Sequence, residues 1–291
     1  MINKIVFDNQ IKLWWDYVKL DKGCSFRVVI DGENFNTTNY HYCFKNLIPN
    51  TNYSFSVDLI NENGVVLEKI GDFEVKTLKK KNFIDVTKEP YNAIGDGVTL
   101  NTDALQSAIN DCTSDDLVYV PDGVYLTGAL DLHSNIELRL SDGAVLQGTV
   151  NEKDYLPKIN SRFEGISEVC YRSLLNCGVI DHKGGCNCEN IIISGGKILS
   201  GGNELRLNQI SAERDGVLKE FGLENDPNRP AYYKSFLPGR RRGRLFHFAN
   251  TKNILIADTF VGNSPSWNIH AIYCEDVTIC NSTIFSHKIN N

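Results

Sequence analysis

Residues 253–285 read NILIADTFVGNSPSWNIHAIYCEDVTICNSTIF and contain two short phrases of nearly the same pattern. The first phrase begins at Asn253, and the second begins 23 residues later at Asp276. In each phrase apolar and polar positions alternate and β-branched residues are frequent, which is typical of a short strand. A strand that recurs after such an interval predicts stacked coils built from one repeating unit.

The beginning of this phrase recurs earlier in the chain. An asparagine followed by isoleucine and a short apolar run stands at positions 135, 190 and 253. Successive turns of a parallel β-helix need a tight corner followed by a short strand, and each coil then covers the apolar face of the next. The sequence therefore predicts a parallel β-helix over residues 83–291.

Two other segments interrupt or close the expected coils. Residues 103–112 have apolar side chains at helical spacing behind a Thr–Asp start, so we expect a short amphipathic helix that covers the open end of the solenoid. Between residues 203 and 243 the strand pattern stops, and proline-containing turns indicate a long excursion. Excursions of this kind often form a wall of a binding cleft.

Residues 1–78 have a different pattern, with short alternating runs separated by turns such as Asp31-Gly32. This spacing predicts an antiparallel β-sandwich. The phrase LIPNTNY at residues 47–53 resembles the corner of fibronectin type III domains at which a tyrosine hydroxyl bonds to backbone upstream. We expect this domain to be a support without chemistry, joined by a lysine-rich linker at residues 79–82.

The composition argues against several classes of function. The chain has 291 residues, of which 42% are hydrophobic, so it can bury a sizeable core. A net charge of -6 argues against a nucleic-acid partner, and no apolar run approaches the roughly 20 residues of a membrane span. The N-terminal residues lack the apolar core of a signal peptide, so the sequence as given predicts a cytoplasmic protein.

The nine cysteines are dispersed and odd in number, unlike a secreted disulfide framework. Cys186 and Cys188 are too close together for the usual zinc spacing, and no second Cys/His pair follows at finger-like distance. We therefore expect no metal, no cofactor, and free thiols that serve as small apolar residues.

Several phrases, in their order, resemble the polygalacturonases of glycoside hydrolase family 28. They include VPDGVYLTG at residues 120–128, LHSNIEL at 132–138 and NSPSWNIH at 263–270. The resemblance extends from about Phe83 to Asn291 and implies a right-handed parallel β-helix without a metal. It also implies inverting hydrolysis of α-1,4-galacturonide linkages in pectic polysaccharide, and the added sandwich suggests exo action. Members of the family are often secreted, so secretion stays open.

The catalytic phrases of that family are absent from the 291 residues. The chain ends at Asn291, where the Asn-Thr-Asp-Gly phrase of the family would begin, and the later Asp-Asp, Gly-His-Gly and Arg-Ile-Lys phrases are missing too. An inverting glycosidase needs one carboxyl to protonate the leaving oxygen and another to activate water, roughly 6.5–9.5 Å apart. We expect the catalytic residues downstream of Asn291 and no turnover by this chain alone.

Five side chains are candidates for holding the substrate. Arg240, Arg242 and Arg244 follow the excursion, and guanidinium groups bind planar carboxylates such as uronates through paired hydrogen bonds. Trp267 suits stacking on a sugar face, and His270 suits a hydrogen bond to it. The plainer interpretation is a solvated loop for the arginines, packing between coils for Trp267, and a structural histidine with satisfied hydrogen bonds for His270. Both interpretations stay open at this point.

Two functions compete with hydrolysis. A β-helix can bind polysaccharide without cleaving it, as in adhesin- or tailspike-like proteins. A pectate-lyase-like eliminase would call for calcium-binding acidic clusters, which the sequence does not show. Sequencing downstream of Asn291 separates hydrolysis from binding without cleavage. A continuation with Thr-Asp-Gly supports the hydrolase, and a stop codon supports the binding protein.

The last expected coil, at residues 276–285, has no cap in the sequence. Apolar core and unpaired strand edges would then be exposed, so we expect the 291-residue chain to associate or to be poorly soluble. Light scattering checks this expectation, and a monodisperse monomer would contradict it.

Overall fold

The computed structural model describes residues 1–181, 183–226 and 238–287. The chain divides into two compact units, Met1–Lys81 and Asn82–Asn291. The boundary falls inside the segment expected to be a linker, and the two units are described separately below.

The N-terminal unit is built of two antiparallel sheets with the strand orders β1-β2-β5 and β4-β3-β6-β7. The strands are β1 (Ile2–Val6), β2 (Ile11–Trp15), β3 (Ser25–Ile30), β4 (Glu33–Thr37), β5 (His41–Phe44), β6 (Asn52–Ile60) and β7 (Val66–Lys76). Both sheets contribute apolar side chains to one core, which contains Trp15, Phe26 and Phe55. This arrangement agrees with the predicted β-sandwich.

The expected tyrosine corner is present in this unit. The backbone N–H of Ile48 donates a hydrogen bond to the Tyr53 hydroxyl at 2.8 Å. The bond satisfies a backbone donor in the turn that leads into β6 and links that turn to the side chain of a β6 residue. Assignment of the sandwich to the fibronectin type III class stays a prediction.

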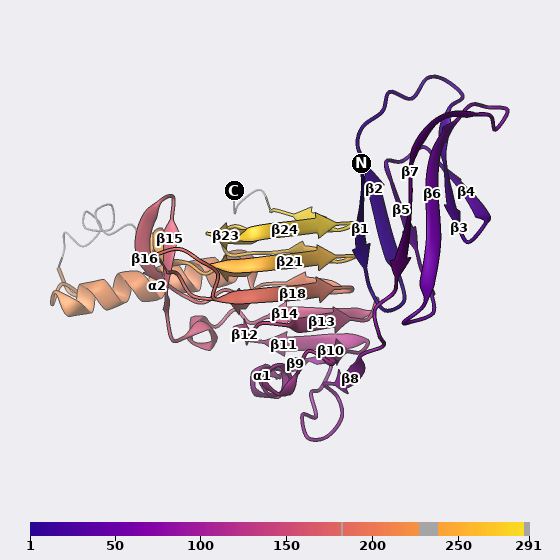
Figure 1. Cartoon of the computed structure of the whole chain (residues 1–291). Helices are drawn as coiled ribbons and strands as arrows, with labels where there is room; N and C mark the ends of the chain where they lie inside the picture. The colour runs from indigo at the N-terminus through magenta and orange to yellow at the C-terminus, as the bar shows by residue number, and fades with distance from the viewer. Residues whose placement is uncertain (182, 227–237, 288–291) are drawn as a thin grey trace. The chain divides into compact units, whose positions relative to one another are not determined.

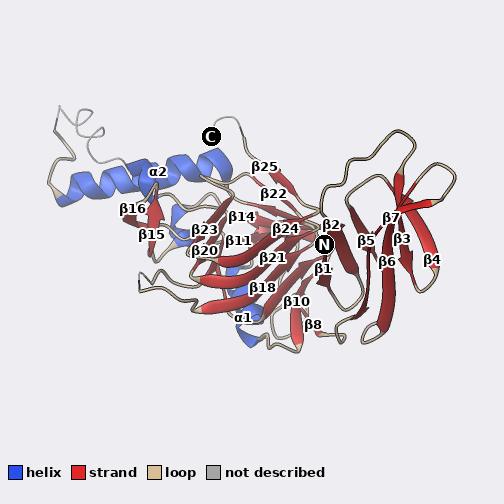
Figure 2. Cartoon of the chain, turned by 45° about the horizontal axis from the view of Figure 1, so that its top comes forward, coloured by secondary structure: helices blue, strands red, loops and turns tan. Residues whose placement is uncertain are grey.

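The second unit is a right-handed parallel β-helix with three parallel sheets (Figures 1 and 2). The first sheet consists of β8 (Asn82–Asp85), β10 (Asp116–Val120), β13 (Ile136–Leu140), β18 (Cys188–Ser194), β21 (Thr251–Ala257) and β24 (Glu275–Cys280). The second consists of β9 (Asp96–Leu100), β11 (Gly123–Thr127), β14 (Ala144–Gly148), β19 (Lys197–Leu199), β22 (Phe260–Gly262) and β25 (Thr283–Phe285). The third consists of β12 (Leu130–Leu132), β17 (Leu175–Cys177), β20 (Phe246–Ala249) and β23 (Ile269–Ile272).

The two matching phrases occupy the same place on successive coils. In the parallel pair of β21 and β24, Ile254 lies opposite Val277 and Ile256 lies opposite Ile279. The 23-residue interval is therefore one coil, as predicted. The predicted parallel β-helix is confirmed.

The recurring asparagines form a ladder at one corner of the coil. Asn135, Asn190 and Asn253 have φ values of 63, 60 and 61°. Asparagine is one of the few residues that enters this left-handed region readily. The Asn190 amide donates to Asn135 Oδ1 at 2.7 Å, and the Asn253 amide donates to Asn190 Oδ1 at 2.9 Å. The ladder therefore fixes the register in which coils stack.

Apolar side chains stack inside the coil in the same register. Ile136 lies opposite Ile191, which lies opposite Ile254, and each is at most 1% exposed. Full burial of one such side chain stabilises the fold by about 1.5–3 kcal/mol. Helix α1 (Thr102–Asp111) packs its buried residues, including Leu105 and Ile109, against this core at the end where β8 and β9 lie. The predicted capping helix is therefore present.

Two insertions interrupt the coils before they reach the third sheet (Figure 2). Between β14 and β17 lie the 3-10 turn η1 (Glu152–Tyr155) and an antiparallel hairpin of β15 (Ile159–Phe163) and β16 (Ile166–Cys170). Between β19 and β20 lie α2 (Gly202–Glu220) and η2 (Pro238–Arg241).

The long helix α2 lies in the segment expected only to be an excursion. Its buried residues include Leu205, Gln209 and Glu213, which recur every four residues. Two of these three are polar, so the helix has no apolar stripe that a search for hydrophobic periodicity would detect.

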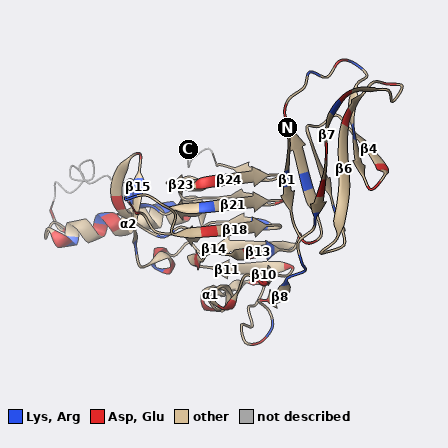
Figure 3. Cartoon of the chain, in the orientation of Figure 1, with Lys and Arg blue, Asp and Glu red and all other residues tan. Residues whose placement is uncertain are grey.

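Charged residues of both signs occur on strands β18, β21 and β24 of the first sheet (Figure 3). Glu189 of β18 lies opposite Lys252 of β21, which lies opposite Glu275 of β24. The ion pair of Lys252 with Glu275 spans 3.9 Å and is well exposed, so it contributes at most about 1 kcal/mol. In the part of the chain that the structure describes, no helix has the length and apolar character needed to cross a membrane.

The last two strands lie at sheet edges. Apolar residues of β24 and β25, among them Val277, Ile279 and Phe285, are 38–50% exposed. Exposed apolar strand edges favour association, and the association of this chain stays a prediction.

Replacement of Asn190 by alanine tests the corner ladder. We expect the free energy of unfolding of the β-helix unit to fall by about 1–3 kcal/mol, because alanine is strained at positive φ and two ladder hydrogen bonds are lost. Urea unfolding followed by circular dichroism measures this change. Asn190→Gly is the matched control, since glycine accepts positive φ and loses only the hydrogen bonds. An equal loss in both variants would show that the backbone conformation is unimportant.

Candidate functional site

One polar side chain from each strand of the third sheet stands at the same register position. Asp131 of β12 lies opposite Asn176 of β17, Asn176 lies opposite His247 of β20, and His247 lies opposite His270 of β23. We call these four residues the polar ladder. The residues before and after each of the first three are buried in the core. Because side chains alternate along a strand, the polar ladder faces away from the coil interior.

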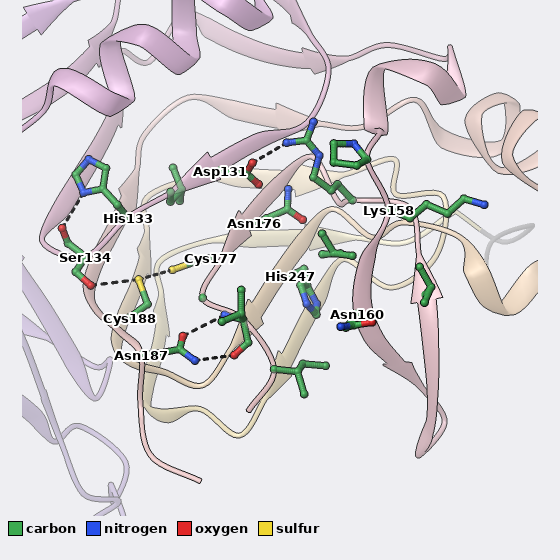
Figure 4. Close-up of a pocket in the computed structure, with 18 residues that line it drawn as sticks. Asp131, His133, Ser134, Lys158, Asn160, Asn176, Cys177, Asn187, Cys188 and His247 are labelled. Atoms are coloured by element: carbon green, nitrogen blue, oxygen red, sulfur yellow. Dashed lines mark hydrogen bonds and ion pairs between the residues drawn. The ribbon is translucent and has the colours of Figure 1, made fainter. Parts of the chain in front are cut away.

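The polar ladder contributes three residues to a pocket of about 770 Å³ (Figure 4). The β15–β16 hairpin and the segment that joins β17 to β18 supply other walls. The polar and charged residues that line the pocket are Asp131, His133, Ser134, Lys158, Asn160, Arg172, Asn176, Asn187 and His247. A pocket of this volume can hold a small ligand.

The charges in the pocket are paired. Arg172 binds Asp131 at 2.6 Å and also donates to the Leu156 carbonyl at 2.5 Å. Lys158 forms an ion pair with Glu213 of α2, whose carboxylate is 3% exposed. Asp131 is the only carboxylate among the described residues that line the pocket. Lys158 and Arg172 are thus each matched by a carboxylate, so the pocket offers charged hydrogen-bond donors to a ligand without an excess of positive charge.

Four of the five predicted substrate residues gather around Phe163 at the end of β15. The Trp267 ring stacks on Phe163 with centroids 4.8 Å apart and an angle of 20°. The guanidinium carbons of Arg242 and Arg244 lie 5.8 and 5.6 Å from the Phe163 ring centre. The His270 ring lies 5.3 Å from the Trp267 ring. We call these five residues the arginine–aromatic cluster.

Arg244 lies inside the protein. It is 1% exposed, and its guanidinium donates to the carbonyls of Arg162 at 2.8 Å and Arg242 at 3.1 Å. It also lies 3.4 Å from the Ser161 hydroxyl. These acceptors stabilise the buried charge in part, whereas the Nε atom of Arg244 has no hydrogen-bond partner among the described residues. Arg244 is therefore neither on a solvated loop nor open to a ligand in this structure, and it holds the β15–β16 hairpin against the coil.

The other two arginines differ in position. Arg242 donates to the carbonyls of Gly239 at 2.6 Å and Pro265 at 3.2 Å. Burial, followed by the neighbouring cations Arg206 and Arg244, lowers the pKa of the Arg242 guanidinium. Arg240 is half-buried in η2 and lies outside the cluster. Contact of these two arginines with a uronate stays a prediction.

Trp267 is the most exposed of the five predicted side chains, at 39%. Its ring stacks on Phe163 of the β15–β16 hairpin and still presents surface to solvent. Stacking of Trp267 on a sugar stays a prediction.

The two histidines of the polar ladder contact each other. Their rings stack at 5.3 Å, and their Nδ1 atoms lie 3.1 Å apart. Burial, the neighbouring His270 and Arg244 lower the pKa of His247 to about 3. Burial and Arg244 lower the pKa of His270 to about 4. At neutral pH both rings are therefore uncharged, and one Nδ1–H donates to the other ring. The pair can exchange hydrogen bonds with a ligand but supplies no positive charge.

Sequence reasoning missed most of the pocket. Lys158 and Asn160 come from the hairpin insertion, which breaks the repeat and follows no periodic pattern. His247 belongs to none of the phrases from which the sequence predicts a substrate contact. The signal that would have found the polar ladder is a single polar residue between two apolar ones, as in Leu-Asp-Leu, Leu-Asn-Cys and Phe-His-Phe. Within the described ranges no group of three His, Cys, Asp or Glu side chains is placed to hold a metal ion.

The fold and the pocket are those of a parallel β-helix protein with a candidate ligand site. Similarities to known proteins narrow this class. Residues 83–165 match the family model described as rhamnogalacturonase A/epimerase, pectate lyase-like. The chain is 30% identical over 252 residues to an exo-poly-alpha-D-galacturonosidase of Dickeya chrysanthemi, which covers 78% of this chain and 40% of that protein. It is 26% identical over 208 residues to a probable polygalacturonase of Vitis vinifera, covering 67% and 36%.

Two solved structures are similar as well. A family 28 exopolygalacturonase of Yersinia enterocolitica has a TM-score of 0.80 at 22% identity and covers 99% of this chain and 60% of that one, which shows the shared fold. A hyperthermoactive exopolygalacturonase of Thermotoga maritima has a TM-score of 0.56 at 27% identity and covers 73% and 48%. Together the comparisons support assigning the chain to a polygalacturonase-like family, glycoside hydrolase family 28. The chain spans about 40% of the length of the curated relatives that it matches.

The pKa values of the histidine pair predict a dependence of stability on pH. Unfolded histidines bind protons near pH 6.5, whereas His247 and His270 do so only near pH 3 and 4 in the folded protein. The unfolded state therefore takes up more protons as pH falls from about 6.5 to 4, and the folded state loses stability over that window. Each histidine contributes up to about 1.4 kcal/mol per pH unit.

Urea unfolding at pH 7, 6, 5 and 4.5 measures this slope. We expect the variant His247→Gln to show a shallower slope than the wild type, because glutamine keeps a hydrogen bond to His270 and does not titrate. The exposed His41 of the N-terminal unit provides the control His41→Gln, which should leave the slope unchanged. A slope in His247→Gln equal to that of the wild type would contradict the assignment of buried neutral rings.

Proposed function

We propose that this chain is part of a polygalacturonase-like glycoside hydrolase that acts on pectic polysaccharide from a chain end. The similarity to the Dickeya exo-poly-alpha-D-galacturonosidase, at 30% identity over 78% of this chain, carries the proposal. The exo-acting Thermotoga protein, at 27% identity, supports the same direction of attack.

The two cationic side chains that line the pocket, Lys158 and Arg172, support a uronate ligand. Each galacturonate unit carries a carboxylate at neutral pH, and Lys158 and Arg172 place two cationic groups along the pocket wall. Both cations already bind an acid, Glu213 and Asp131 respectively, which holds their side chains in place. A pre-positioned cation loses less conformational entropy when a ligand binds than a free surface lysine does. We assign the two residues to recognition of the substrate carboxylate.

The insertions support action at a chain end. The β15–β16 hairpin borders the pocket, and η2 and α2 pack behind the hairpin through the ion pairs of Arg241 with Glu168 at 3.4 Å and with Glu213 at 3.2 Å. A site walled in this way suits the terminal unit of a polymer, whereas an open groove suits its middle. His270 continues the third sheet beyond the pocket, Trp267 stands just before strand β23, and we assign both to a neighbouring sugar.

The chemistry of inversion sets a further requirement. One carboxyl must protonate the leaving oxygen while a second activates water. The described pocket lining offers Asp131 alone, and Arg172 holds it in an ion pair. We therefore propose that the general acid and base come from residues downstream of Asn291, and that this chain supplies binding surface to the active site.

The single lining carboxylate also favours a second candidate, a β-helix that binds polysaccharide without cleaving it. Product analysis separates the two candidates. A reducing-end assay on polygalacturonate is run with the 291-residue chain and with the product of the same gene extended downstream. Turnover by the extended chain alone supports the hydrolase, and no turnover by either supports the binding protein. Turnover by the 291-residue chain would contradict the assignment of the acid and base.

Binding by the pocket is tested by titration calorimetry with trigalacturonate at pH 7. We expect Lys158→Gln to weaken binding by about tenfold, since a hydrogen bond between charged groups is worth about 1.5–3 kcal/mol and part of it survives through Arg172. The exposed Lys219 of α2 gives the matched control Lys219→Gln, which should bind as the wild type does. The neutral trisaccharide maltotriose should not bind. Equal binding by both variants would remove Lys158 from the site.

A further inference from the structure

Two buried cysteines meet at the edge of the pocket. Cys177 ends β17 and Cys188 begins β18, so the two residues belong to different sheets of the coil. Their Sγ atoms lie 3.1 Å apart, and the residues are 2% and 6% exposed (Figure 4). The sulfur atoms of a disulfide lie about 2.05 Å apart. The thiols therefore need to approach by only about 1 Å to form a bond.

Other buried thiols of the β-helix are placed differently. Those of buried Cys112 and Cys170 point at backbone carbonyl oxygens at 3.6 and 3.5 Å, as does that of half-buried Cys274 at 3.5 Å. Such contacts fit the expected role of cysteine as a small apolar residue with a weak donor. The pair of Cys177 and Cys188 is distinguished from them by a direct contact between two sulfur atoms.

The surroundings of Cys188 favour its thiolate. The Cys177 thiol donates to its sulfur, and the Ser134 hydroxyl donates to it at 3.5 Å. The hydrogen bond from Cys177, followed by that from Ser134, holds the pKa of Cys188 below its ordinary value despite burial. Both residues also border the pocket but are nearly buried, so we expect only a small reagent that enters the pocket to react with them.

The loop between the two cysteines is already closed by hydrogen bonds. The Asn187 side chain accepts from the Val179 N–H at 3.1 Å and donates to the Val179 carbonyl at 2.7 Å. Gly178 has a φ of 67°, and a β-carbon there would meet the Ala249 carbonyl oxygen. The ends of the loop are thus fixed in the positions that a cross-link between residues 177 and 188 requires.

We propose that Cys177 and Cys188 are a redox-active pair that forms an intramolecular disulfide and so ties the third sheet to the first beside the pocket. The inference is independent of the proposed function, because it concerns only these thiols and the loop that they close.

The oxidation is a thiol–disulfide exchange with a small-molecule disulfide as the oxidant. The Cys188 thiolate attacks one sulfur of the reagent, the S–S bond of the reagent breaks, and one thiolate leaves. Cys177 then gives its proton to that thiolate, attacks Cys188 Sγ and displaces the second thiolate, which takes a proton from water. The protein loses two thiols, and the reagent is reduced to two thiols.

The 291-residue chain is tested by incubation with oxidised glutathione or with the smaller linear disulfide bis(2-hydroxyethyl) disulfide. Free thiols are counted with Ellman's reagent after denaturation, and peptides are mapped by mass spectrometry. We expect the count to fall from nine by two, with a single cross-linked peptide pair that joins residues 177 and 188. The oxidised protein should melt roughly 5 °C higher than the reduced protein, because the bond constrains the unfolded chain.

Exposed Cys186 is the competing partner, since it lies two residues from Cys188. The variant Cys186→Ser should still lose two thiols, and Cys170→Ser, at another buried thiol, should do so as well. Cys188→Ser should form no intramolecular bond at Cys177. A bond between Cys186 and Cys188, a dimer linked through Cys186, or an unchanged count in the wild type would overturn the proposal, and none of these readouts requires a variant to fold.

Discussion

The stacking of one coil on the next is the constraint on which the β-helix depends. A single coil cannot bury its own apolar face or pair its own strands, so each needs a neighbour in register. Hydrogen bonds between parallel strands, the buried isoleucines and the ladder of Asn135, Asn190 and Asn253 all enforce the same register. Because these terms agree, the repeat tolerates long insertions at its corners without loss of alignment.

The two insertions are held in place by buried charged side chains. The β15–β16 hairpin is held to the coil by the buried guanidinium of Arg244 and to α2 by Glu213, which binds both Lys158 and Arg241. Breaking one partner of such a network leaves a buried charge unpaired, which costs several kcal/mol. The wall of the pocket is thus fixed by electrostatic contacts, whereas the coil beneath it is fixed by apolar packing.

The third sheet carries a row of polar side chains on its outer face. Its strands put one polar residue per coil on the same line, and that line runs from Asp131 in the pocket to His270 beside Trp267. A repeating scaffold therefore presents polar groups at the spacing of neighbouring strands, close to 4.8 Å. This regular row of side chains belongs to the surface to which we assign the sugar units of the proposed substrate.

The repeat can be predicted from the sequence alone. The phrases at Asn253 and Asp276, the asparagine corners and the capping helix all follow from local periodicity, which depends only on residues close together in the chain. It also singled out Trp267 and His270, whose contact with a substrate stays a prediction. The pocket could not be predicted from the sequence. Its residues Lys158, Arg172 and His247 are far apart in the chain, and no local sequence pattern shows that they lie together. Burial of Arg244 and the contact of Cys177 with Cys188 likewise depend on neighbours distant in sequence.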